Sequence, residues 1–144
     1  MEKTNEILEH IYKNVKMGSD SITSLLPKVK DERMISDLTT QLSGYEGFAL
    51  RASDMLKNSG VHPEEESLMK KIPAKAGIAM NMAMDPSSSH IAEMMIQGSS
   101  MGIVDMTKYI NAAKRVSISK EAVDLAGEVV TFEEDNIERL KAYL

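Results

Sequence analysis

The sequence predicts an all-α protein, a single domain of residues 1–144 built as an antiparallel bundle of four long helices. Apolar residues recur every three or four positions over long stretches, which is the spacing of amphipathic helices. Proline is scarce, at 4 of 144 residues, and glycine is modest. Two short turns and one long connection divide the chain, as in a bundle in which one link runs back along the helices.

The first two helices form the first predicted pair. We expect one helix from about residue 4 to residue 26, which Pro27 ends because proline lacks a backbone N–H. The next helix is expected over residues 32–58. Asn58-Ser59-Gly60 is a typical stop, since glycine tolerates the left-handed conformation that closes a helix. The short turn between them predicts antiparallel neighbours.

The connection over about residues 59–85 is expected to contain a short amphipathic helix at 61–84, kinked at Pro73. We interpret it as a crossover that packs on the bundle or on a partner chain. Its lysines leave a membrane-surface segment as an alternative. The alternation of Met80, Met82 and Met84 resembles copper(I)-binding segments. Packing is preferred, because in a helix Met82 would point away from the other two.

The third helix is expected from about Pro86 to Arg115, with Asp85 as its cap and the serines at 87–89 as alternatives. Apolar residues occur on every side of it, so we expect it to be the most buried helix. Gly98 and Gly102 lie four positions apart and would let another backbone approach closely. This packing would offset the cost of glycine inside a helix.

The third helix also carries a polar stripe formed by His90, Glu93 and Gln97, which share one face at spacings of three and four. One interpretation is a metal or proton site in the core of the bundle. The other is that Glu93 favours the helix dipole and His90 marks the solvated end. This helix alone leaves both interpretations open.

The fourth helix follows Ser119, its expected cap, and carries the least expected residue of the chain. Glu133 falls in the middle of the apolar sector. A buried carboxylate must be neutralised by a proton, by Arg or Lys, or by a metal ion. The alternatives are a small error in helical register and a salt bridge at a subunit interface.

Composition and charge exclude several classes of function. A net charge of −5 without a basic face argues against nucleic acid. The chain has no cysteine, and therefore no disulfide or thiolate site. No run approaches the roughly 18 apolar residues of a membrane span, and the N-terminus MEKTNEILEH lacks a signal peptide's apolar core. We expect a cytoplasmic protein. No nucleophile–base pair or cofactor motif appears, so its being an enzyme is uncertain and disfavoured.

The order of the four helices and the segment HIAEMMIQGSSMG at 90–102 resemble small bacterial proteins of the ferritin-like group. Such proteins place a Glu on each of two helices and a Glu-x-x-His pair on each of the other two. The resemblance implies metal ligands at Glu46, His90, Glu93 and Glu133. The first helix supplies no inner carboxylate and the third carries His-x-x-Glu, so these four candidates suit one ion of iron, manganese or zinc.

Two functional hypotheses follow. The first is a ferritin-like bundle that binds one metal ion in its core through those four residues. The alternative is a non-catalytic bundle with a degenerate site that acts by self-association, as a dimer, or through a protein partner. The concentration of methionines between residues 69 and 106, the Gly98/Gly102 groove and the amphipathic crossover favour this alternative.

Overall fold

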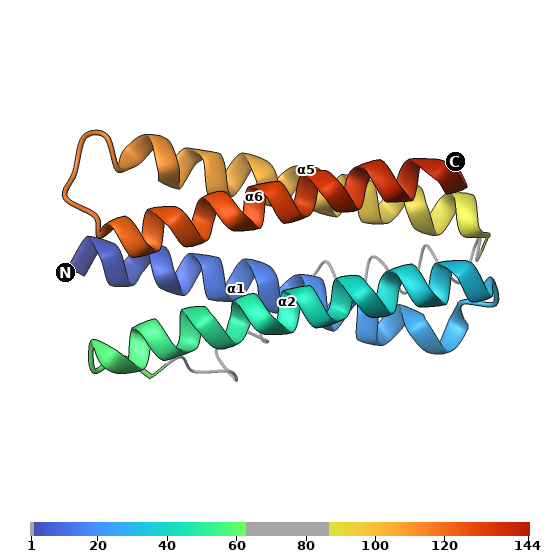
Figure 1. Ribbon diagram of the computed structural model, residues 1–144, viewed down its shortest axis with the longest axis horizontal. Coiled ribbons are helices and arrows are strands. Elements are labelled where there is room, and N and C mark those ends of the chain that lie inside the picture. Colours follow the sequence, from blue (N-terminus) through green and yellow to red (C-terminus); the bar gives the residue numbers. More distant parts are fainter. Residues whose placement is uncertain (1, 63–86) are drawn as a thin grey trace.

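The computed structural model describes residues 2–62 and 87–144, and these ranges form helices and no strand. The four long helices are α1 (Glu2–Leu25), α2 (Glu32–Asn58), α5 (Ser88–Ala112) and α6 (Lys120–Leu140) (Figure 1). Short 3₁₀ turns at Leu26–Lys28 and Lys141–Tyr143 follow α1 and α6. The predicted all-α class and its four long helices are confirmed. The expected helix at 61–84 lies outside the described residues, except for its first two.

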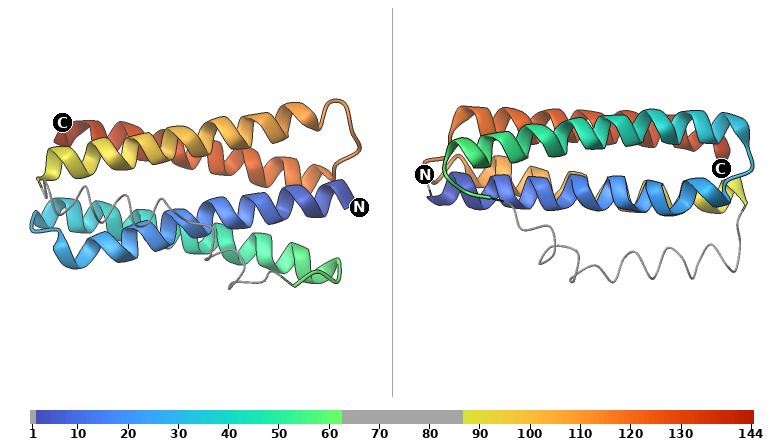
Figure 2. Two further views of the ribbon diagram at one scale, coloured as in Figure 1. Left: turned by 180° about the vertical axis from the view of Figure 1, so that it is seen from behind. Right: turned by 90° about the horizontal axis from the view of Figure 1, so that it is seen from below.

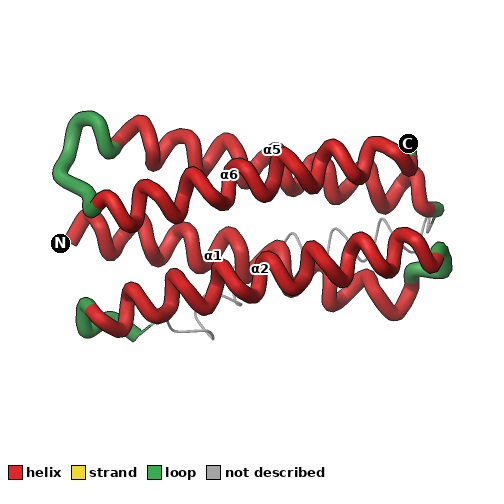
Figure 3. Tube along the Cα trace, viewed as in Figure 1, coloured by secondary structure: helices red, strands yellow, loops and turns green. Residues whose placement is uncertain are grey.

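The helices form two antiparallel pairs, α1 with α2 and α5 with α6 (Figure 2). The pairs face each other, so that α1 also contacts α5 and α2 contacts α6. The connection between α1 and α2 and the connection between α5 and α6 lie at opposite ends of the bundle, and each closes one pair (Figure 3). α1 and α6 run opposite to α2 and α5, so the helices of each pair are antiparallel, as are α1 with α5 and α2 with α6. α1 and α6 also contact each other, and these two run parallel. In the part of the chain that is described, no helix combines the length and apolar character that crossing a membrane requires.

Side-chain caps set where three of the helices begin. Asp31 accepts hydrogen bonds from the backbone N–H groups of Arg33 (2.9 Å) and Met34 (3.3 Å). Ser119 caps α6 by accepting from Ala122 N–H, as predicted. Ser87, one of the alternatives to Asp85, caps α5. These bonds satisfy N–H groups that the first turn of a helix leaves unpaired.

Gly60 stands just after α2, at the predicted stop. Its φ of +80° is the left-handed conformation that glycine adopts without a steric penalty. The predicted C-terminal stop of this helix is therefore confirmed.

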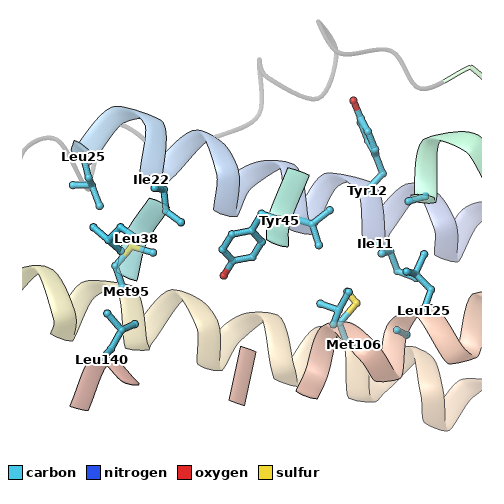
Figure 4. Close-up of a cluster of buried hydrophobic side chains, with 14 of the residues drawn as sticks. Ile11, Tyr12, Ile22, Leu25, Leu38, Tyr45, Met95, Met106, Leu125 and Leu140 are labelled. Carbon is cyan, nitrogen blue, oxygen red and sulfur yellow. The ribbon is translucent and has the colours of Figure 1, made fainter. Parts of the chain in front are cut away.

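Aliphatic side chains from all four helices fill the core (Figure 4). The apolar stripes predicted for α1, α2 and α6 supply most of it. Its largest fully buried apolar side chains are Ile11, Ile22, Leu25, Met34, Leu38, Leu56, Ile91, Met106, Leu125 and Leu140. Since burying such side chains is the main favourable contribution to folding, this core holds the two helix pairs together.

Helix α5 is not buried on every side, contrary to the prediction. Met101 is 69% exposed and Val104 is 53% exposed. The helix packs along α6 and contacts α1, and its remaining face carries these apolar side chains outward. An all-round apolar pattern therefore did not distinguish a buried helix from one with an apolar outer face.

Glycines in α1 and α2 make room for aromatic rings. A Cβ on Gly18 would lie 2.5 Å from Cε1 of Tyr45, and one on Gly44 would lie 2.6 Å from Cζ of Phe132. Phe132 contacts Tyr45 edge-on at 4.9 Å between ring centroids, and Phe48 at 5.2 Å. The absence of a side chain at Gly44 therefore lets Phe132 of α6 pack close to the backbone of α2.

We expect Gly44→Ala to destabilise the protein and Gly47→Ala, in the same helix, to stabilise it. The alanine at 44 would overlap a ring held by two neighbouring rings, which costs about 1–3 kcal/mol. An added Cβ at Gly47 meets no described atom within 4 Å. The better helix propensity of alanine there should contribute up to about 1 kcal/mol. Urea unfolding measures the free energy of unfolding of both variants. If the two substitutions changed this free energy equally, the close packing of Phe132 on Gly44 would be contradicted.

Candidate functional site

Glu133 lies in the core, as the apolar pattern around it predicted. It occupies the inner face of α6 and is only 2% exposed. Among the described residues it takes part in none of the ion pairs. The arginine or lysine partner that would neutralise a buried carboxylate is therefore not supplied by the described part of the chain.

The environment of Glu133 favours the protonated carboxyl. Burial raises its pKa to about 7, while interactions with the hydroxyls of Tyr45 and Ser99 lower it in part. Burial acts this way because the charged form loses more hydration than the neutral form. At neutral pH the group is therefore divided between its protonated and ionised forms.

Three buried polar side chains surround this carboxyl, and we call the four residues Tyr45, Ser99, Glu133 and Asn136 the Glu133 cluster. Tyr45 extends from α2 into the interior, with its hydroxyl directed toward α5 (Figure 4). Burial, and then the charge of Glu133 and a hydrogen-bonding interaction with it, raise the pKa of Tyr45 well above its usual value. Ser99 and Asn136 interact with the same hydroxyl. The cluster therefore joins α2, α5 and α6 through polar groups inside an apolar core.

Several atoms of this region have no hydrogen-bond partner among the described residues. They are Oε1 of Glu133, Oγ of Ser99, Nδ2 of Asn136, and both side-chain polar atoms of Gln41. The Ser99 hydroxyl faces the carboxyl closely enough to favour its ionised form, but it does not complete a hydrogen bond. Buried polar atoms are rarely left unpaired, because each costs about 1–3 kcal/mol. The cluster is therefore able to bind further donors and acceptors.

A pocket of about 170 Å³ adjoins the cluster between α1 and α5. Glu133, Tyr45 and Ser99 all line it. The described lining residues include four methionines and two carboxylates, those of Asp105 and Glu133, and include no Lys, Arg or His. The described lining is therefore largely apolar, and it holds carboxyl groups but no basic side chain.

Gly102 places oxygen atoms at this pocket. A Cβ on it would lie 3.1 Å from Oε2 of Glu133 and 3.2 Å from Oδ1 of Asn14. The predicted role of Gly98 and Gly102 was close approach of a backbone. At Gly102 that prediction is wrong: polar side chains from α6 and α1 come close to it instead. At Gly98 no described atom lies within 4 Å of an added Cβ.

The structure does not bring the four predicted metal ligands together. Glu46 is exposed on α2, and the Glu93 side chain is 60% exposed on α5. His90 is half-buried, and its Nδ1 lies 4.0 Å from Oε2 of Glu93. Across residues 2–62 and 87–144, no three His, Cys, Asp or Glu side chains form a group that could hold a metal ion. The donor set therefore does not fit the two-metal site of ferritin-like proteins.

Sequence reasoning found Glu133 but missed its neighbours. Ser99 and Asn136 look like ordinary polar residues of amphipathic helices, and Tyr45 falls at helical spacing from Leu38 and Leu42, as an ordinary core residue would. One available signal was the spacing of Glu133 and Asn136, three positions apart on the inner face of α6. Another was Gln41, which stands three positions after Leu38 and four before Tyr45 in the sequence and which is buried.

Comparison of the chain with protein-family models, curated proteins and solved structures finds no match. The resemblance to ferritin-like proteins therefore remains a prediction.

We expect Glu133→Gln to be more stable than the natural protein at pH 8, with a smaller difference at pH 5. The native carboxyl keeps a proton that the unfolded chain releases between its ordinary pKa of 4.5 and about 7. The stability of the natural protein should therefore fall as pH rises through this window, by about 3 kcal/mol at about 1.4 kcal/mol per pKa unit.

Urea unfolding at several pH values measures this difference, and Glu134→Gln, at an exposed position of the same helix, is the matched control. The other titratable groups that line the pocket are Tyr45 of α2 and Asp105 of α5, and both variants retain them. If Glu133→Gln and Glu134→Gln gave the same pH profile, the raised pKa of Glu133 would be refuted.

Proposed function

We propose that this protein is a ferritin-like bundle that binds a cation in the pocket at the Glu133 cluster, as a binding protein and not as an enzyme. One observation carries the proposal. A buried carboxylate has one oxygen without a partner, and it lines a pocket whose described walls hold no positive side chain. A bound cation would supply the positive counter-charge that no described side chain provides for this carboxylate.

The negative charge of the pocket supports the choice of a cation. Asp105 lines it beside Glu133, and both carboxylates repel anions. In a region of low polarity, opposite charges attract more strongly than in water. A ligand of positive charge therefore gains from both groups, whereas an anion would have no described partner there.

A metal ion is one form of such a cation, but the ligands for it differ from those predicted. Glu46 and Glu93 are exposed, so Glu133 would have to act with pocket oxygens such as those of Asn14 and Asp105. Oxygen donors suit magnesium, calcium or manganese more than zinc, which prefers nitrogen or sulfur. No redox step follows from this donor set.

The ferritin-like topology is part of the proposal. Helix α2 ends at one end of the bundle, and α5 begins at the other (Figure 1). A four-helix bundle with one long crossover between its second and third helices has this arrangement. The antiparallel packing within each pair, and of α1 with α5 and α2 with α6, also supports it.

Cation binding is tested by titrating the purified protein, Glu133→Gln and Glu134→Gln with magnesium, calcium, manganese, zinc and ferrous ions and with butylammonium. We expect at least one of these cations to bind the natural protein and Glu134→Gln equally. Its affinity for Glu133→Gln should fall by at least about tenfold, which is about 1.4 kcal/mol. Isothermal titration calorimetry measures the affinities, and elemental analysis detects a retained metal. Equal affinity for all three proteins, or no binding by any cation, would refute the proposal.

Self-association is a second candidate function, favoured by the outer face of α5. Met101 and Val104 are large apolar side chains, 69% and 53% exposed, at positions three apart on one helix. Apolar groups that recur at helical spacing suit the packing of one helix against another. A second copy of the chain would cover them in a dimer.

We expect a dimer at micromolar concentration that Val104→Lys dissociates, because the substitution buries a charge in the interface. Thr131→Lys, at an exposed polar position of α6, should leave the dimer intact. Sedimentation velocity distinguishes the two states. A natural protein that stays monomeric under these conditions would rule out this candidate.

A further inference from the structure

We infer that the cation held at Glu133 is the ammonium group of a small aliphatic amine, whose apolar chain lies against the methionines of the pocket. The inference rests on the proposed cation binding and names the class of ligand. Two features of one cavity carry it: an incompletely bonded carboxylate at its polar end, and walls of apolar, adaptable side chains.

The polar end of the pocket presents acceptors that match N–H donors. Glu133 lines the pocket, and its Oε1 is buried without a partner among the described residues. Oε2 of Glu133 and Oδ1 of Asn14 lie 3.1 and 3.2 Å from one common point, the Cβ position of Gly102. An ammonium group has three N–H donors and a positive charge, and hydrogen bonds between ionised partners are the stronger kind. A primary amine can therefore donate to several of these oxygens.

The walls match an alkyl chain more closely than a metal ion. Met17 comes from α1, and Met94 and Met95 come from α5. Met101 of α5, which is 69% exposed, lies at the open edge of the pocket. Methionine is flexible and polarizable, and it fits the irregular surface of an apolar ligand. A hard metal ion keeps water or takes several oxygens, and so gains nothing from thioether walls. A soft ion such as copper(I) would use the sulfur atoms but leave the hard carboxylate mismatched.

The volume of the pocket limits the size of the ligand. At about 170 Å³ it is smaller than the roughly 300–1,000 Å³ of sites for drug-sized molecules. It is close to the roughly 150 Å³ of an apolar cavity that admits benzene. The pocket therefore suits an amine with a chain of about four to six carbon atoms.

The charges exclude the other common classes of small ligand. A carboxylic acid or phosphate would face Glu133 and Asp105 with no described cationic side chain in the lining. A quaternary ammonium ion has no N–H to donate to the free carboxylate oxygen, and the one ring in the described lining, that of Tyr45, does not make an aromatic cage. A neutral alcohol would contact the apolar walls of the pocket but would not supply a positive charge to pair with Glu133.

The test compares three probes of similar size, n-butylammonium, butan-1-ol and butanoate, on the full chain carrying ¹³C-methyl methionine. We expect butylammonium to shift the resonances of the pocket methionines, with an affinity at least about tenfold above that of butan-1-ol. Butanoate should not bind. Glu133→Gln should lower the affinity for butylammonium by at least about tenfold, toward that of the alcohol. Glu134→Gln should leave it unchanged.

Gly98→Leu tests the pocket without altering the carboxylate. Gly98 lines the pocket, and apart from the backbone of its own helix no described atom lies within 4 Å of an added Cβ. A leucine side chain therefore has room there, and we expect it to occupy part of the space that the alkyl chain would take. We expect the variant to fold, since leucine favours helix over glycine, and to lose butylammonium binding. The same variant shows whether binding occurs in this cavity if Glu133→Gln fails to fold.

The outcomes separate the inference from the proposed function. Metal binding that depends on Glu133, without amine binding, would overturn the amine assignment and leave cation binding in place. If neither binds, both are refuted. Equal affinity for butylammonium and butan-1-ol would show an apolar cavity that does not use the charge, and this also overturns the inference. Amine binding that Gly98→Leu leaves unchanged would overturn the inference as well.

Discussion

The ionisation of a single carboxyl group inside an apolar core is the constraint on which the centre of this bundle depends. Glu133 is almost completely buried, and no described cation pairs with it. An isolated charge in such a place is strongly unfavourable. The carboxyl group must therefore take up a proton, bind a ligand of opposite charge, or be stabilised by surrounding dipoles. The hydroxyls of Tyr45 and Ser99 provide part of that stabilisation. The helices that carry them, α2 and α5, are thereby joined to α6 by polar interactions as well as by packing.

Glycines shape the space around this carboxyl. Gly18 accommodates the ring of Tyr45, whose hydroxyl then reaches Glu133. Gly102 leaves room for the carboxylate and for Asn14 of α1. Glycine inside a helix lowers its stability by about 1 kcal/mol relative to alanine, so each position requires a compensating contact. At these two positions the compensation is the approach of Tyr45 and of polar oxygens, which together place acceptors at the edge of a methionine-lined pocket.

A buried acid without a described cationic partner and a small apolar pocket are together more informative than either alone. The buried acid explains why a positive group would be attracted, and the methionines explain why that group would carry an apolar chain. The predicted ferritin-like metal site would need several carboxylates and imidazoles around one point. In the described structure two of the four predicted ligands, Glu46 and Glu93, lie at the surface instead. The described part of this centre therefore combines one buried carboxyl group with an apolar lining and does not gather the predicted metal ligands.

The sequence by itself determined the elements of this protein, because helical periodicity, caps and stops are local properties. The spacing of apolar residues placed four helices, Ser119 and Gly60 marked two of their ends, and the position of Glu133 in an apolar sector showed that it would be buried. Only the tertiary structure decided what surrounds that carboxyl. Tyr45, Ser99 and Glu133 come from three different helices, and their meeting depends on how those helices are rotated and aligned. The same rotation turned Glu46 and Glu93 outward and exposed Met101, although their helical spacing alone allowed either orientation.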